Sequence, residues 1–526
     1  MLEHAIRVDG GLVRGVPDEN GAGTVFRGIP FATPPTGELR WRPPAPVREW
    51  TGELLCDRFG PACMQPMVPR DGLMALFSFA DPPECGVSED CLYLNVWTCA
   101  EDPAERRPVI FYVFGGGNRV GAGSHPVSRG HNLARRGAVV VTVNYRLGPL
   151  GFLAHPALTA EQGTSGNYAG QDLVAALGWV RRNIARFGGD PDCVTLVGQS
   201  AGAGHVQSLM ASPQARGLFH RAVGSSGGRF AAEAYGYGME TLAQAEDKSR
   251  AVLEKAGVQD LEGMRNHPVD QLYGPRNFWE IIADGHFLPE TSQAAFEAGH
   301  QADVPFLAGF NADEASPYPA PHLWSRQALA EDLRRQFGPD RAAELLSLYP
   351  VADDADAKRT AYRLRTEGGF TWQAWQWAVS HARTAAAPTW LARYEQPLAL
   401  PADARFRQPP PPGGYGAFHG SELFYLFDTL DTRPDWPWTE QDRAVADLCA
   451  TTLLTFARTG DPRHEGLPSW PRFTGPEGAA MHFSPTPFAG PLEEQPRLAA
   501  FSRLFADQAE RAEQAEQATA TATVTR

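Results

Sequence analysis

The chain lacks the cysteine and histidine clusters that hold structural zinc. Its seven cysteines are an odd number, and none stands in a Cys-x-x-Cys spacing or in a Cys/His cluster. The sequence therefore implies neither a metal nor any other cofactor.

Positive charge is also scarce. The 526 residues include 61 acidic side chains and 47 basic ones, only three of which are lysines, and the formal net charge is −14. This balance argues against nonspecific binding to nucleic acid and against attraction to anionic membranes.

Long apolar runs are missing as well. No run approaches the roughly 20 residues that cross a membrane, and Met1–Val8 has no basic region followed by an apolar one. We therefore expect no membrane span and a cytoplasmic location, with secretion as the alternative.

Short β-branched runs predict a central sheet from residue 92 onward. The runs at 109–114, 138–144 and 194–197 are apolar throughout, as in parallel strands with both faces covered by helices. Helical spacing over 171–187 predicts one covering helix. The fold class is therefore α/β, with a mostly parallel twisted sheet flanked by helices in one domain over residues 1–505.

Three further segments differ from this pattern. Residues 229–300 and 320–390 are mostly helical in spacing, and we expect them to be insertions that cap the sheet edge. Residues 506–526 are rich in Ala, Gln and Thr without apolar periodicity, which predicts a disordered tail.

The most informative segment is Gly198-Gln199-Ser200-Ala201-Gly202, which follows an apolar run and opens a stretch of small residues. The pattern predicts a strand, a sharp turn and a helix, with the Ser200 hydroxyl exposed at the apex and the Ala201 N–H aimed at a substrate oxygen. Because the chain has 53 glycines, such a match also arises by chance. The neighbouring segments must therefore show whether Ser200 is a catalytic serine.

A serine nucleophile needs hydrogen-bond donors for the oxyanion that forms. The segment Phe114-Gly115-Gly116-Gly117-Asn118 directly follows a predicted strand, where bare backbone N–H groups are free to face a substrate. The N–H groups of Gly116, Gly117 and Ala201 would form a three-donor oxyanion hole. The alternative is an ordinary flexible turn.

The serine also needs a base and a carboxylate that orients the base. Among fourteen histidines, His419 stands late in the chain in a glycine-flanked loop, as the order serine, acid, histidine requires. The apolar run at 307–310 ends in a polar turn that contains Asp313 and Glu314. Spacing alone leaves both open as the acid.

Taken in order, these segments resemble the type-B carboxylesterase/cholinesterase-like family over about residues 5–500. The resemblance also rests on residues 26–32, 34–41, 89–96, 144–152, 166–168, 183–191, 284–289, 311–314 and 419–422.

This resemblance implies an α/β-hydrolase fold with a helical cap over an active-site gorge. It implies Glu314, rather than Asp313, as the acid. It also implies that Ser226 forms a hydrogen bond with this acid on the side away from the substrate. Cys63 and Cys91 stand where many members of the family have a disulfide, a bond that a reducing cytosol disfavours.

Departures from the family pattern concern substrate choice. Gln199 replaces the usual Glu before the nucleophile and keeps its hydrogen-bonding shape without the charge. Asn118 either presents a polar amide to the acyl pocket or caps the oxyanion loop. Phe114, Trp279 and Phe370 are further candidates for lining the substrate pocket.

The function expected from the resemblance is hydrolysis of carboxylic esters through an acyl-Ser200 intermediate, with a small-molecule ester as the partner. One alternative is a biosynthetic acyl transfer, lactonisation or elimination on the same machinery. Another is a noncatalytic binding relative, which the presence of all three triad candidates disfavours. The sequence does not predict an oligomeric state.

Overall fold

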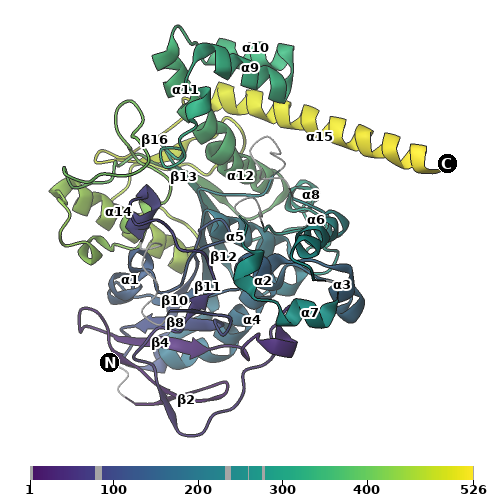
Figure 1. The fold of residues 1–526 in the computed structure, drawn as a ribbon. Coiled ribbons are helices and arrows are strands. Elements are labelled where there is room, and N and C mark those ends of the chain that lie inside the picture. The colour runs from purple at the N-terminus through teal and green to yellow at the C-terminus, as the bar shows by residue number, and fades with distance from the viewer. Residues whose placement is uncertain (1–3, 78–85, 231–238, 259, 275–278, 525–526) are drawn as a thin grey trace.

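The computed structural model describes residues 4–77, 86–230, 239–258, 260–274 and 279–524. An eleven-stranded sheet runs through the molecule (Figure 1). Its strands lie in the order β16 (Phe488–Gly490), β15 (Ala480–Phe483), β14 (Thr389–Tyr394), β13 (Phe306–Asn311), β12 (Arg221–Ser225), β11 (Gly189–Gln199), β9 (Arg107–Val113), β10 (Val139–Val143), β8 (Tyr93–Thr98), β4 (Thr24–Pro30) and β3 (Val16–Pro17).

The middle of this sheet is parallel and its edges are antiparallel. All neighbouring pairs from β15 to β10 are parallel, whereas β16, β8, β4 and β3 pair antiparallel with their neighbours. The parallel strands are buried on both faces, as their continuous apolar runs predict. The prediction of a mostly parallel sheet is confirmed.

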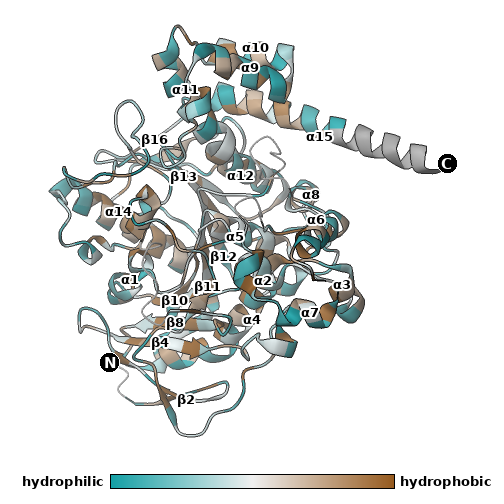
Figure 2. Ribbon diagram, viewed as in Figure 1, coloured by the Kyte–Doolittle hydropathy of each residue, from teal (hydrophilic) through white to brown (hydrophobic). Residues whose placement is uncertain are grey.

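The helices cover both faces of the sheet and extend beyond one end of it (Figure 1). They are α1 (His131–Arg135), α2 (Gly148–Phe152), α3 (Pro156–Gln162), α4 (Tyr168–Asn183), α5 (Ala201–Ala211), α6 (Leu242–Lys255), α7 (Leu261–Asn266), α8 (Ser292–Ala298), α9 (Arg326–Phe337), α10 (Pro339–Leu348), α11 (Asp354–Thr366), α12 (Trp372–Thr384), α13 (Glu422–Leu426), α14 (Glu440–Thr459) and α15 (Gln495–Val524). Hydrophobic and hydrophilic residues alternate along outer helices such as α9 and α10 (Figure 2).

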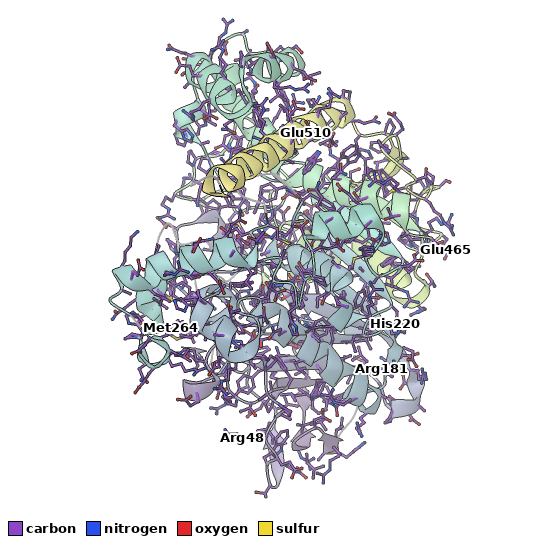
Figure 3. All side chains as sticks on the ribbon, turned by 90° about the vertical axis from the view of Figure 1, so that its right-hand side faces the viewer. Arg48, Arg181, His220, Met264, Glu465 and Glu510 are labelled. Carbon is purple, nitrogen blue, oxygen red and sulfur yellow. The ribbon has the colours of Figure 1, made fainter. Side chains whose placement is uncertain are left out.

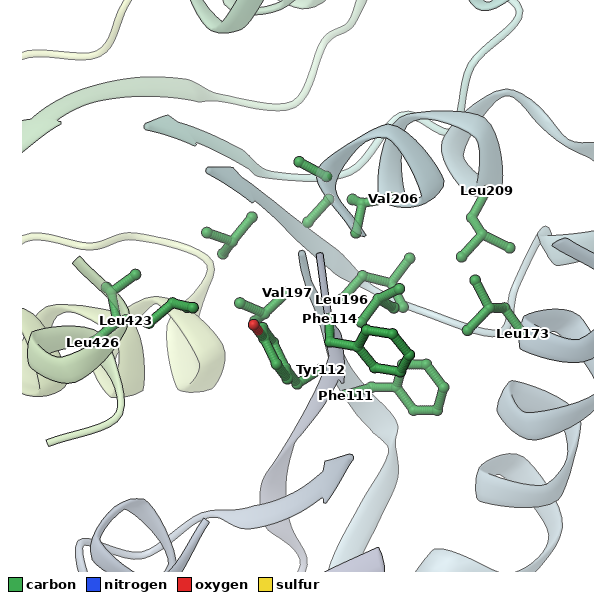
Figure 4. Packing of buried hydrophobic residues seen from close by; sticks show 14 of the residues in the cluster. Phe111, Tyr112, Phe114, Leu173, Leu196, Val197, Val206, Leu209, Leu423 and Leu426 are labelled. Atoms are coloured by element: carbon green, nitrogen blue, oxygen red, sulfur yellow. The ribbon is translucent and has the colours of Figure 1, made fainter. Parts of the chain in front are cut away.

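Alternation along the strands builds a core on each side of the sheet. Leu196 on β11 faces α5, where Val206 and Leu209 lie, whereas its neighbour Val197 faces α13 and Leu423 (Figure 4). All of these side chains are at most 5% exposed. Successive residues of a strand point to opposite faces, so β11 is anchored from both sides just before Ser200.

The ends of the helices follow local sequence signals. Helix α14 begins after Thr439, whose hydroxyl accepts the N–H of Asp442 while the Asp442 carboxylate accepts the N–H of Thr439. It ends at Gly460, which has φ 76°.

Two smaller sheets lie outside the main one. Strands β1 (Ile6–Val8), β2 (Gly11–Arg14) and β5 (Glu53–Leu55) form the first, and β6 (Ala62–Cys63) pairs with β7 (Val87–Ser88) in the second. The region predicted as the first insertion contains α6, α7 and α8, and the region predicted as the second contains α9 to α12. Helices α9, α10 and α11 lie with α15 at one end of the molecule (Figure 1).

Helix α15 covers much of the segment predicted to be a disordered tail, residues 506–526. It is continuous from Gln495 to Val524 and leaves the body of the molecule (Figure 1), and Glu510 lies on it (Figure 3). Ala and Gln favour helix even where an apolar stripe is missing, which compositional reasoning about disorder overlooks. Among the described residues, no helix combines the length and apolarity that a membrane span requires.

Candidate active site

Ser200 lies at the junction of β11 and α5 with φ 58° and ψ −125°. Residues other than glycine rarely adopt this conformation, so the turn is strained. The Ser200 N–H donates to the carbonyl of Ser225 on β12 at 2.9 Å, and the Ser200 carbonyl accepts the N–H of Gly204 at 3.1 Å. Contacts with the neighbouring strand and with α5 therefore hold the turn in place.

The turn packs closely against the end of β9. A Cβ atom at Gly202 would lie 2.1 Å from the backbone oxygen of Val113, so a larger residue does not fit without movement of the backbone. A Cβ atom at Gly115 would lie 2.8 Å from the Cβ of Ser200. The glycine loop after β9 thus lies directly beside the predicted nucleophile.

The predicted oxyanion donors come from this loop and from α5. Gly116 and Gly117 both have positive φ, 120° and 62°, which suits glycine. Ala201 is the first residue of α5, where backbone N–H groups have no acceptor within the helix. The three residues therefore lie on the two segments that meet at Ser200.

His419 and Glu314 form a buried pair. Nδ1 of His419 lies 2.6 Å from Oε2 of Glu314, and the two residues are 1% and 0% exposed. The other oxygen of Glu314 accepts the N–H of Asn311 at 2.7 Å. Because a carboxylate only accepts, Nδ1 donates to Glu314 and Nε2 is left to take a proton.

Asp313 has a different role from its neighbour. Its Oδ2 accepts the N–H of Ala417 at 3.0 Å, and its own N–H donates to the carbonyl of Ala417 at 2.9 Å. Burial raises the pKa of the Asp313 carboxyl above its ordinary value. Of the two acids that spacing left open, the structure brings Glu314 to His419 and uses Asp313 to tie down the His419 loop.

Gln199 faces the free nitrogen of the same histidine. Its Nε2 lies 3.4 Å from Nε2 of His419, and the residue is 5% exposed. An amide N–H donates to the unprotonated ring nitrogen and so helps to fix the ring.

A second buried carboxylate, Glu422, has no role that the sequence predicts. Its Oε1 accepts the hydroxyls of Ser225 at 2.7 Å and Ser226 at 3.3 Å, and its Oε2 accepts the amide of Asn311 at 2.5 Å. Burial, followed by the charge of Glu314, raises the pKa of Glu422. The expected bond from Ser226 to Glu314 is therefore corrected, because the Ser226 hydroxyl donates to Glu422.

Aromatic side chains surround His419. The ring of Phe370 lies 4.7 Å from the imidazole, and Tyr318 lies 5.7 Å from the imidazole and stacks on Phe370. The sequence predicts Phe370 near the site but not Tyr318, because no local pattern marks the tyrosine. Phe114 is 3% exposed and stacks on Tyr145 at 4.4 Å, and Trp279 is 4% exposed.

Cys63 and Cys91 carry free, buried thiols. A hydrogen bond between them, together with burial, raises the pKa of Cys91. Among the described residues, no group of three or more His, Cys, Asp or Glu side chains could hold a metal ion.

The sheet order, the strained turn and the His–Glu pair are those of an α/β-hydrolase. A sequence profile described as the carboxylesterase family matches residues 3–499, so the chain belongs to the carboxylesterase family.

Relatives and solved structures agree with this assignment. The chain is 36% identical over 482 residues to fumonisin B1 esterase of Sphingopyxis macrogoltabida, covering 88% of this chain and 83% of that protein. It is 32% identical over 496 residues to para-nitrobenzyl esterase of Bacillus subtilis (strain 168), covering 90% and 93%. A solved structure titled PNB esterase superposes with a TM-score of 0.78 at 28% identity, covering 95% of this chain and 100% of that one.

The protein is a carboxylic ester hydrolase with the α/β-hydrolase fold. The predictions of the fold class, the family and ester hydrolysis are therefore confirmed. The biosynthetic alternative finds no support among these relatives, which are named as esterases.

Proposed function

We propose that ester hydrolysis proceeds through an acyl intermediate on Ser200, with His419 as base and Glu314 as the carboxylate that orients it. The observation that carries this proposal is the 2.6 Å contact between His419 and Glu314, which is buried and leaves Nε2 of His419 as a proton acceptor. The strained backbone of Ser200 supports it as the nucleophile.

In the first half of the reaction, Nε2 of His419 takes the hydroxyl proton while the Ser200 oxygen attacks the ester carbonyl. The carbonyl oxygen becomes an oxyanion and accepts the N–H groups of Gly116, Gly117 and Ala201. As the tetrahedral intermediate collapses, His419 returns the proton to the leaving alcohol, and the acyl group remains on Ser200.

In the second half, His419 takes a proton from water, and the resulting hydroxide attacks the acyl carbonyl. The same three N–H groups stabilise the second oxyanion. The intermediate releases the carboxylic acid, and the proton on His419 restores the Ser200 hydroxyl. Glu314 remains ionised throughout and stabilises the imidazolium that forms in each half.

We propose a small-molecule carboxylic ester as the substrate, with Phe370 and Tyr318 lining the pocket beside His419. The support is their ring contacts with the imidazole. Phe114 is a weaker candidate, because its ring is buried in a stack with Tyr145. We also propose a cytoplasmic location. The free thiols of Cys63 and Cys91 support it, because a reducing cytosol keeps thiols reduced.

The test uses a short-chain chromogenic ester and an organophosphonate probe on the full chain. The unchanged protein should release the chromophore and be labelled on Ser200. Ser200→Ala should lose both properties with little change in melting temperature. Turnover that persists in Ser200→Ala, or labelling at another residue, would contradict the proposed nucleophile.

A further inference from the structure

Four polar side chains from separate segments meet beside the proposed oxyanion hole. Asn118 comes directly after Gly117, and His205 lies on α5. The other two are Arg229, which follows β12, and Glu280. Oδ1 of Asn118 lies 3.1 Å from Nε2 of His205, and Nδ2 of Asn118 lies 2.9 Å from Oε2 of Glu280. Arg229 forms an ion pair with the same Glu280 oxygen.

The chemistry of the groups fixes the direction of every bond in this chain. The Glu280 carboxylate only accepts, so the Asn118 group facing it is the amino group. The Asn118 carbonyl oxygen must then face His205, and Nε2 of His205 must carry the proton. Nδ1 of His205 is buried with no hydrogen-bond partner among the described residues, which agrees with this tautomer.

Burial keeps the direction constant over the working pH range. Asn118 and His205 are 1% and 0% exposed, and Arg229 is 5% exposed. Burial, followed by the charge of Arg229, lowers the pKa of His205 to about 3. The imidazole of His205 therefore stays neutral at pH values well below its ordinary titration range.

The backbone at this position also suits asparagine. Asn118 has φ 57°, a left-handed conformation that asparagine adopts more readily than most residues. Its backbone carbonyl accepts the N–H of Gly148 at 2.7 Å. Because both ends of its amide are bonded within the protein, Asn118 does not offer that amide to a substrate. The structure thus favours the second of the two roles expected from the sequence, that of a loop cap.

We propose that Asn118 is a positioning residue that fixes the oxyanion-hole loop by accepting from His205 and donating to Glu280. Because Asn118 directly follows Gly117, this clamp sets where the N–H groups of Gly116 and Gly117 point. Misplaced donors stabilise the transition state poorly while leaving ground-state binding intact. The inference rests on the proposed function, since it assigns the oxyanion hole to this loop.

The test reverses the direction of one bond and then restores it. Asn118→Asp keeps the shape of the side chain but places a second acceptor against Glu280, and kcat should fall about 10- to 100-fold with KM changed less than about threefold. Glu280→Gln alone keeps an acceptor for Asn118 but removes the charge that faces Arg229, so it is measured beside the others as the second single variant of the cycle. When the two changes are combined, the introduced glutamine donates its amide to the introduced carboxylate and accepts from Arg229. The double variant should therefore recover at least about fivefold in kcat over Asn118→Asp.

A purely structural role would lower stability without this pattern of loss and recovery. Asn266→Asp, which adds the same charge at an exposed position, should leave kcat unchanged. The proposal is overturned if Asn118→Asp changes only KM, if kcat is unaffected, or if the double variant is no faster than Asn118→Asp. If Asn118→Asp does not fold, the double variant must still fold and turn over. If the organophosphonate probe does not label Ser200 in the unchanged protein, the proposed function itself is contradicted.

Discussion

At the scale of single residues, the contact between Glu314 and His419 is where a small change should cost most activity. Glu314→Gln keeps the volume of the side chain but presents no charge to the imidazolium and favours the wrong tautomer of His419. We expect kcat to fall roughly 10³- to 10⁴-fold with a modest change in KM, as measured by steady-state ester hydrolysis.

The adjacent acid provides a matched control. Asp313→Asn retains an oxygen that accepts the N–H of Ala417, so the His419 loop should keep its position and kcat should stay within about tenfold. If Asp313→Asn were the more damaging of the two changes, the assignment of Glu314 would be wrong.

A second residue, His381, should make the fold sensitive to acid. It is 0% exposed, its Nε2–H donates to the carbonyl of Val304 at 3.0 Å, and burial lowers its pKa to about 4 from an ordinary 6.5. Between these values the unfolded chain binds the proton more readily than the folded one. The free energy of unfolding should therefore fall as the pH drops below about 6.5, by roughly 3 kcal/mol from this residue at pH 4.

His381→Gln removes this titration and retains a donor for Val304. Chemical denaturation at pH 5 and pH 7.5 should show the unchanged protein losing about 2 kcal/mol more stability in acid than the variant, because the loss begins only below about pH 6.5. Parallel losses in the two proteins would show that His381 does not contribute to acid sensitivity.

The catalytic candidates were predictable from the sequence because each occurs in a local pattern. Ser200 has flanking glycines after a strand, and His419 has a glycine-flanked loop late in the chain. Glu422, Tyr318 and His205 have no such pattern, since their contacts at the site come only from packing of distant segments. The single local signal for Glu422 was its place three residues after His419.

At the scale of elements, the junction of β11 with α5 has no spare room. In Gly202→Ala the new methyl group would lie 2.1 Å from the Val113 oxygen, and the backbone of β9 or α5 must move. We expect the free energy of unfolding to fall by about 1–3 kcal/mol and ester turnover to drop more than tenfold, because the same movement displaces Ser200.

Gly178→Ala on α4 is the control for this change. Its added methyl group would meet only the flexible end of Arg182, at 3.1 Å, and alanine favours helix over glycine by about 1 kcal/mol. Thermal melting should therefore show a small gain for Gly178→Ala and a loss for Gly202→Ala. Equal stability of the two variants would argue against the tight junction.

Elements buried on both faces were the easiest to predict. Runs 109–114, 138–144 and 194–197 correspond to β9, β10 and β11, and the helix expected at 171–187 corresponds to α4 and the turn after it. Strand β14 was not predicted, because its run Thr389–Tyr394 includes Arg393 and adjoins a region of helical spacing. Its strand conformation depends on pairing with β13 and β15.

At the scale of the whole molecule, composition and family resemblance predicted one α/β domain but not the position of the chain's end. Strand order is set by pairings between residues far apart in the sequence, such as β14 with β15, which periodicity does not encode. Helix α15 was not predicted either, because the residues beyond its packed part show no apolar periodicity.

Two truncations separate the packed and projecting parts of α15. Leu498, Phe501, Leu504 and Phe505 are at most 3% exposed, and the ion pairs Arg503–Glu344 and Arg341–Asp507 link this helix to α10. Each such apolar side chain contributes about 1.5–3 kcal/mol when buried. A chain that ends at residue 494 should therefore melt more than about 5 °C lower, or fail to fold.

A chain that ends at residue 511 keeps all of these contacts. It should melt within about 2 °C of the full chain and hydrolyse esters at the same rate, because the deleted residues belong to the part of α15 that projects from the body (Figure 1). Melting followed by circular dichroism, with ester turnover on the same samples, measures both effects. A large loss of stability in this longer chain would mean that the projecting part of α15 makes contacts of its own, for instance with a second copy of the protein.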